Sequence, residues 1–297
     1  MMQLYRDLPD GDACGIFGTE DALGALNRQT PETIRFARDS IKTGQVFSLN
    51  APLNWPDPPL FNRAPAEHSV YTTDMGNRDD YLDKFYLQAS SQWDSFQHFR
   101  DPETGFYNHL PHEDLGIEKW AQRGIAGRAV LLDVERHLAA QGRPLRWAER
   151  TEIGVDVLEA VRAAQGIQPH EGDILLIRTG WTTGYQAATT EQRKRVRTVH
   201  DSPGLEPSLG MVEYLWDWGV SAIAADNIGV EPLPIQGPIS LHARLLSRLG
   251  VPFGEFWWLD ELAAHSAEDG RYTSFLTSAP LHLVGGVGSP ANALAIK

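Results

Sequence analysis

The second half of the chain alternates short apolar runs with amphipathic segments, and this alternation constrains the fold most. Four runs are expected strands: AVLLDV (129–134), DILLIRTG (173–180), SAIAAD (221–226) and SFLTSAPLHLV (274–284). Because each run is almost continuously apolar, the strands are expected to be buried on both faces of a sheet. Expected helices lie between them, at 151–165, 207–218, 240–249 and about 259–267. Strands that alternate with helices predict an α/β domain.

The first third of the chain contains a helix, a strand and an irregular loop. Thr30, Pro31 and Glu32 are a hydroxyl cap, a first-turn proline and an acid at the positive end of a helix. A strand is expected at 46–49, followed by the proline-rich loop 51–65, whose aromatic residues argue against disorder. No repeat, linker or low-complexity segment divides the chain, so we expect one domain over 1–297.

Composition excludes several classes of partner. The formal charge is −13, from 26 basic and 39 acidic residues, which disfavours nucleic acid and anionic membranes as partners. The basic cluster RKRVR (193–197) is expected to be a solvated helix face. No segment approaches the roughly 18 apolar residues of a membrane span, and the N-terminus lacks a signal-like apolar run, so a cytoplasmic protein is expected. Cys14 is the only cysteine, which excludes an intrachain disulfide and a thiolate zinc cluster.

The stretch LQASSQWDSFQHF (87–99) concentrates polar groups at even spacing. On an extended strand, Gln88, Gln92, Asp94 and His98 would all project from one face. Burying such groups without partners costs a few kcal/mol each, so this face is expected to contact a ligand or other polar residues.

The same stretch resembles the signature of a known family. Gln88-Ala-Ser-Ser-Gln92-Trp-Asp94-Ser-Phe-Gln-His98 is similar to H-x-G-T-H-x-D-x-x-x-H of the metal-dependent cyclase/hydrolase family, which includes bacterial kynurenine formamidase and isatin hydrolase. Segments FGTEDALGALNRQTPE, GQVFSLNAPL, GDILLIRTGW and PGLEPSLGMVEYLWDWGVSAIAADN resemble further parts of that family. The resemblance implies a single α/β domain with a mixed sheet, the swivelling β/β/α fold.

The resemblance also implies a set of site residues. Gln88 and Gln92 match the two metal-binding histidines, Asp94 the bridging aspartate and His98 the catalytic histidine. In SLHARLLSRLGVPFGEF (240–256), His242 and Glu255 match the residues that complete the metal centre, at an interval about one residue longer than usual.

Two glutamines in place of histidines leave the presence of a metal open. Gln88, Gln92, Asp94, His242 and Glu255 form a mostly oxygen set, which suits Mn²⁺ or Mg²⁺ better than Zn²⁺. In the alternative, the glutamines hydrogen-bond the two carboxylates and no ion binds. The two alternatives, a bound Mn²⁺ or Zn²⁺ and a metal-free site, have equal weight.

These residues predict chemistry at a carbonyl group. We expect hydrolysis or ring closure at an amide, imide or lactone bond of a small aromatic molecule, by metal-activated water with His98 as acid and base. The alternative is a metal-free cyclase or lyase that uses Asp94, Glu255 and His98 directly. An inactive relative that binds a small molecule is the third hypothesis, and the four retained ionisable groups disfavour it.

Further candidates surround this set. In the family an aromatic residue of an N-terminal loop covers the substrate, so 1–65 is expected to be an arm and covering loop. Expected substrate contacts are Trp55, Phe61, Trp93 and Trp181. Asp226 ends an apolar run, and it is expected either to anchor His242 or a water at the metal, or to stabilise a turn. The family resemblance implies a homo-oligomer, a dimer or tetramer.

Two other kinds of site are not expected. The glycine-rich stretch GGVGSPAN (285–292) follows the last expected strand and opens no helix, so it is not expected to be a phosphate-binding loop for a nucleotide. The sequence contains no G-x-S-x-G motif, so a serine hydrolase is not expected.

Overall fold

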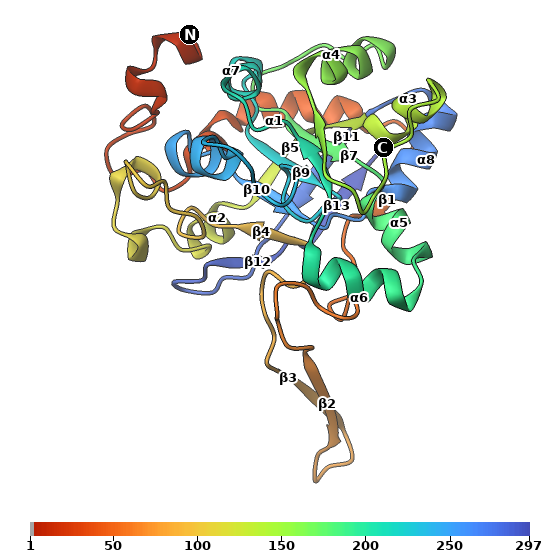
Figure 1. Cartoon of the computed structure of the whole chain (residues 1–297). Helices are drawn as coiled ribbons and strands as arrows, with labels where there is room; N and C mark the ends of the chain where they lie inside the picture. Colours follow the sequence, from red (N-terminus) through yellow and green to blue (C-terminus); the bar gives the residue numbers. More distant parts are fainter. Residues whose placement is uncertain (1–2) are drawn as a thin grey trace.

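A computed structural model of the chain describes residues 3–297, so the first two residues of the predicted arm lie outside the described residues. Its centre is one nine-stranded mixed sheet in the order β1-β13-β11-β5-β7-β9-β10-β4-β12 (Figure 1). The strands are β1 (Val46–Ser48), β4 (Gln92–Asp94), β5 (Ile125–Asp133), β7 (Ile174–Arg178), β9 (Ala222–Ala225), β10 (Phe253–Glu255), β11 (Thr273–Ser278), β12 (Gly288–Pro290) and β13 (Ala293–Ile296). The predicted single α/β domain with a mixed sheet is confirmed.

The middle of the sheet is parallel and buried. Strands β5, β7, β9 and β10 pair in parallel, whereas the pairs toward both edges are antiparallel. Every residue of β7 and β9 is buried, as their continuous apolar runs predict. The expected strand 274–284 ends at Ser278, however, and the glycine-rich stretch 285–292 contains β12. The expectation that no strand follows 284 is therefore wrong.

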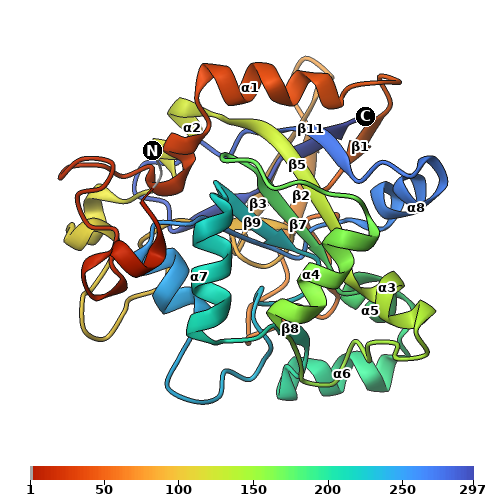
Figure 2. The same ribbon diagram turned by 90° about the horizontal axis from the view of Figure 1, so that it is seen from above.

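Helices cover the sheet on both sides. They are α1 (Pro31–Ala37), α2 (Glu118–Arg123), α3 (Val134–Ala140), α4 (Val155–Ala164), α5 (Trp181–Ala187), α6 (Thr190–Val199), α7 (Leu209–Trp218), α8 (Asp260–Asp269) and the π-helix η7 (His242–Arg248). Short 3₁₀ turns lie at Tyr5–Asp7, Pro9–Gly11, Gly24–Arg28, Arg38–Ser40, Tyr107–His109 and His112–Asp114. In Figure 1, α1, α4 and α7 lie above the sheet and α5 and α6 below it; Figure 2 shows α1 running along β5 and β11.

Local sequence explains where two of these elements begin. Helix α1 starts at Pro31, and the hydroxyl of Thr30 accepts a hydrogen bond from the Thr33 amide at 3.3 Å. Residues 151–153, expected to be the start of a helix, instead form β6 (Thr151–Ile153), which pairs with β8 (Pro203–Leu205). Helix α4 then begins after Gly154.

The proline-rich loop is held by an aromatic cluster separate from the main core. This second cluster contains Leu60, Trp181, Tyr185, Val196, Ile228 and Phe256, with Trp55 packed against it. Trp55 contacts Trp181 and Tyr185 edge to face, with centroids 5.8 and 5.5 Å apart. The loop is thereby fixed against α5 and α6.

A hairpin projects from the body of the molecule (Figure 1). It consists of β2 (Glu67–Thr72) and β3 (Arg78–Asp83), and all but one of their residues are exposed. No pattern in the sequence predicted this hairpin. None of the helices between residues 3 and 297 has the length and apolar character needed to span a lipid bilayer.

Candidate active site

Strand β4 carries the centre of the site. It lies between β10 and β12, with Gln92 opposite Glu255 and Asp94 opposite Phe253. Gln92 and Asp94 share one face, and Gln92 Nε2 donates a hydrogen bond of 2.7 Å to Glu255 Oε2. Asp94 is fully buried. The short strand therefore brings the predicted Gln92, Asp94 and Glu255 together.

The expected long strand over 87–99 is wrong, because β4 has only three residues. Phe96 is buried against Trp120 and Tyr107, and the chain turns there, with the His98 amide donating to the Ser95 carbonyl at 2.9 Å. This turn brings His98 Nε2 to 3.9 Å from Asp94 Oδ1. His98 thus reaches the site through a turn rather than through strand alternation.

Gln88 lies in the turn before β4 and is half-buried. Its side-chain amide lies against Gly288 of β12. Within residues 3–297 this amide makes no hydrogen bond to Asp94 or Glu255, so only Gln92 makes the contact that the metal-free alternative expected of both glutamines.

His242 is the first residue of η7 and is held from both sides. Its Nδ1 donates to Glu231 Oε1 at 2.6 Å, and its Nε2 lies 3.3 Å from Glu255 Oε1. Glu231 is fully buried and also accepts the backbone amides of Leu241 and His242 at 2.9 and 3.0 Å. A carboxylate that binds one imidazole nitrogen fixes the direction of the other nitrogen. Glu231 therefore orients His242 toward Glu255.

Asp226 does not contact His242. Its carboxylate accepts the amide and hydroxyl of Thr179 at 2.6 and 2.7 Å and the amide of Gly180 at 2.8 Å. These contacts match the turn-stabilising alternative, at the junction of β7 and α5. Glu231 was not predicted from the sequence, where its only signal is an isolated acid in the apolar stretch IGVEPLP.

Burial and neighbouring charges shift the acidities of the group. Burial raises the pKa of Asp94 to about 6, assisted by the charge of Glu255 and opposed by His98, His242 and Arg63. Burial alone would lower the pKa of His242, but hydrogen bonds to Glu231 and Glu255 outweigh it and raise the pKa to about 10. Without a metal ion, His242 is therefore most stable as an imidazolium between the carboxylates of Glu231 and Glu255.

The donor atoms fit a divalent cation. Asp94, His242 and Glu255 each offer one ligand atom, and these atoms lie within 4.8 Å of one another. Both Asp94 oxygens and Gln92 Oε1 are buried without a hydrogen-bond partner in the described part of the chain. Unpartnered buried oxygens cost free energy that an ion would offset. Three oxygen donors and one oriented imidazole are a donor set that suits a divalent cation.

The predicted aromatic contacts separate into two groups. Trp93 points away from Asp94, is fully buried, and donates to the Ser278 hydroxyl at 2.8 Å. Trp181 is also fully buried, beneath Trp55. The structure does not bring these two to an open surface. Trp55 is half-buried and Phe61 is 37% exposed, so both remain accessible from the loop.

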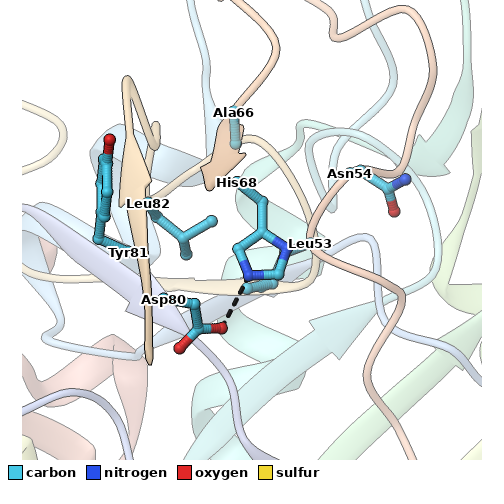
Figure 3. A pocket seen from close by; sticks show the side chains of 7 residues that line it. All are labelled: Leu53, Asn54, Ala66, His68, Asp80, Tyr81 and Leu82. Carbon is cyan, nitrogen blue, oxygen red and sulfur yellow. Dashed lines mark hydrogen bonds and ion pairs between the residues drawn. The ribbon is translucent and has the colours of Figure 1, made fainter. Parts of the chain in front are cut away.

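Two grooves lie beside the proline-rich loop. One of about 210 Å³ is lined by aromatic residues that include Trp55, Phe85 and Tyr86, together with Ala64 and Ala89. A wider groove of about 680 Å³ lies at the hairpin, where His68 and Asp80 pair at 2.7 Å (Figure 3). Both side chains of that pair are more than half exposed, so it is a surface ion pair with no buried acid beside it. The acid–base groups lie instead at β4 and β10.

Comparisons with known proteins agree with this architecture. Isatin hydrolase A from Ralstonia solanacearum superposes with a TM-score of 0.62 at 18% identity, over 91% of this chain and 99% of that one. An isatin hydrolase bound to the product analogue thioisatinate gives 0.60 at 19% identity, over 88% and 94%. At sequence identities this low, the similarity to the two isatin hydrolases shows a shared fold only. Among curated proteins no sequence match to this chain is found.

Two further comparisons concern the family itself. A crystal structure described as a novel cyclase superposes with a TM-score of 0.86 at 34% identity, and the alignment covers 96% of this chain and 99% of that one. The family model Cyclase, described as "Putative cyclase", matches residues 46–232. The protein is an enzyme of the cyclase/hydrolase type that acts on small molecules, and the chain belongs to the Cyclase family.

Proposed function

We propose that the enzyme hydrolyses, or closes, an amide, imide or lactone bond in a small aromatic molecule. The observation that carries this proposal is the pair of buried Asp94 oxygens without a partner, beside Glu255 and His242 and 3.9 Å from the half-exposed His98. Buried carboxylates beside an accessible imidazole are the groups that proton transfer at a carbonyl requires. The neighbours named isatin hydrolases support a hydrolytic reaction on a small molecule.

His98 is the proposed proton carrier. It takes the proton of the attacking water while the new carbon–oxygen bond forms, and it returns that proton to the leaving nitrogen or oxygen as the old bond breaks. Asp94 Oδ1 lies 3.9 Å from His98 Nε2 and stabilises the imidazolium that forms between these two steps. Gln92 holds Glu255 in place through its 2.7 Å hydrogen bond.

Asp94, His242 and Glu255, with Gln92 Oε1, would hold a divalent cation. When bound, Mn²⁺ or Zn²⁺ supplies a Lewis acid that polarises a carbonyl oxygen. One observation favours a second candidate, a metal-free cyclase or lyase. His242 Nε2 already lies 3.3 Å from Glu255, so the imidazolium can stabilise the carboxylate without an ion.

Metal analysis separates these candidates. Protein purified without a metal-affinity tag would be measured by inductively coupled plasma mass spectrometry, before and after dialysis against Mn²⁺ and Zn²⁺. About one tightly held ion per chain supports the hydrolase with a metal, and no ion above background supports the metal-free enzyme.

Turnover tests the proposal as a whole. A panel of aromatic amides, imides and lactones, assayed in both directions by absorbance, should contain substrates that the wild type converts. A His98→Ala variant that turns them over at a near-normal rate would refute the assignment of His98. Binding without turnover across the whole panel would favour an inactive relative.

A further inference from the structure

The turn at residues 60–63 carries an arginine whose guanidinium contacts the turn that precedes β4. Leu60 is buried in the second aromatic cluster, whereas Phe61 and Asn62 both have φ of 57°. Two consecutive non-glycine residues in the left-handed region are uncommon, and such strain concentrates where a segment has a functional role. The turn closes with the Arg63 amide donating to the Leu60 carbonyl at 3.1 Å, and the Arg63 side chain is half-buried.

A three-layer stack holds this arginine in place. The rings of Phe61 and His200 stack with centroids 4.4 Å apart and planes at 12°. The guanidinium carbon of Arg63 lies 5.0 Å from the centre of the Phe61 ring. The guanidinium also donates a hydrogen bond to the Gln88 carbonyl, in the turn that precedes β4. Its position is therefore fixed before any ligand arrives.

Most of the hydrogen-bonding capacity of Arg63 is unused. A guanidinium carries five N–H donors, and in residues 3–297 its side chain donates only to Gln88 and forms no ion pair within 4.0 Å. Burial lowers the pKa of Arg63, and the charges of Glu255 and Asp94 oppose that shift. A half-buried cation beside a catalytic cluster, with donors to spare, is arranged to receive an anion.

The adjacent groove defines the shape of that anion. Ala64 and Ala89, the chain neighbours of Arg63 and Gln88, line the groove of about 210 Å³. Trp55, Phe85 and Tyr86 form its aromatic walls, which suit a flat ring. Asp57 also lines the groove and Arg63 itself does not, so the carboxylate of a ring bound there has to extend beyond the groove to reach the guanidinium.

We propose that Arg63 is the anion-binding residue of the site, and that it receives the carboxylate of an open-chain aromatic acid. This inference rests on the proposed function, because hydrolysis of a cyclic amide, imide or lactone produces such an acid. Water adds across the carbonyl–heteroatom bond: the carbonyl carbon gains the oxygen and becomes a carboxylate, the heteroatom gains one proton, and one proton is released. Ring closure reverses these steps and loses water. In a chain with a net charge of −13, a fixed guanidinium provides the local positive charge that such a ligand needs.

Calorimetric titration with benzoate and benzamide tests the proposal. The two probes share a ring and differ in charge, so their comparison isolates the carboxylate. The variants are Arg63→Gln, which removes the charge, Arg63→Lys, which keeps the charge without the planar fork, and Arg100→Gln as the matched control at an exposed arginine. Near-ultraviolet circular dichroism confirms that each variant is folded.

We expect Arg63→Gln to weaken benzoate binding about 10- to 100-fold, the range of a lost charged hydrogen bond. The benzoate affinity of Arg63→Lys should lie between those of the wild type and Arg63→Gln. Arg100→Gln should bind benzoate as the wild type does, and no variant should change the affinity for benzamide. Equal benzoate affinity in wild type and Arg63→Gln would overturn the proposal, as would a wild type that does not bind benzoate at millimolar concentrations.

The outcome is separable from that of the proposed function. If His98→Ala abolishes turnover of the panel while Arg63→Gln binds benzoate normally, the inference about Arg63 alone fails. If no panel compound is converted but benzoate binding requires Arg63, the anion site stands and the proposed reaction fails.

Discussion

The buried pair of Asp101 and Arg248 joins the two segments that supply the site histidines. Asp101 follows His98 by three residues, and Arg248 ends η7, which begins at His242. Arg248 donates to both Asp101 oxygens, at 2.8 and 3.0 Å. The amides of Glu103 and Thr104 donate to the same carboxylate at 2.8 and 3.0 Å. An Asp101→Asn substitution removes the charge from this arrangement with little change of volume.

The expected effect on stability depends on pH. Burial alone would raise the pKa of Asp101, but hydrogen bonds from Arg248 and the two amides outweigh burial and lower it to about 2 from 3.8. The folded-state pKa lies below the unfolded value, so this stabilisation is complete above about pH 5 and is lost as the pH falls toward 2. Linkage gives about 2 kcal/mol in total, of which about 1 kcal/mol is lost between pH 7 and pH 3.

Urea unfolding followed by tryptophan fluorescence measures this difference. At pH 7, Asp101→Asn should lower the free energy of unfolding by about 3 kcal/mol or more, because Arg248 loses its buried counter-charge. At pH 3 the gap between variant and wild type should be about 1 kcal/mol smaller. Asp79→Asn, at an exposed position of β3, is the control and should show no such change. A gap that stays constant between pH 7 and pH 3 would refute the reasoning.

Other predictions test the remaining parts of the site and fold. His98→Ala should reduce kcat about 10²- to 10⁴-fold with unchanged circular dichroism, the range for one positioned proton-transfer group. Glu231→Gln should weaken Mn²⁺ or Zn²⁺ binding about 10- to 100-fold in equilibrium dialysis, since His242 loses the carboxylate that orients it; unchanged affinity would contradict that role. Trp93→Ala should lower the free energy of unfolding by about 3–5 kcal/mol, because the fully buried indole packs in the core. The dimer or tetramer that the family resemblance implies is checked by size-exclusion chromatography with light scattering.

The central strands could be predicted because burial on both faces leaves a pattern in sequence. The runs at 129–134, 173–180 and 221–226 became β5, β7 and β9 within a few residues at each end. The site strand β4 carries no such pattern, because only three residues pair and polar Gln92 and Asp94 flank a core tryptophan. Its true length depends on the partners β10 and β12, which come from 159 or more residues later in the chain.

Some site residues could be identified from spacing and others could not. The resemblance located Asp94, His242 and Glu255, which the structure brings within 4.8 Å. Glu231 was missed because its role arises from how the chain folds back before η7, and no local pattern encodes that approach. Arg63 was missed for the same reason: its relation to Gln88 comes from a left-handed turn at non-glycine residues, which propensities do not predict.

The pairing of the sheet has a consequence for synthesis of the chain. Strand β1 pairs with β13, and β4 lies between β10 and β12, so these two strands from the first third of the chain are paired only by segments from its final 45 residues. Emerging first from the ribosome, β1 and β4 have no strand partners until translation is nearly complete. Contacts of this kind slow folding and leave an unpaired strand edge exposed in the meantime. A chain that terminates before residue 288 therefore lacks both β12 and β13, and it exposes Trp93 and the edge of β4 to aggregation.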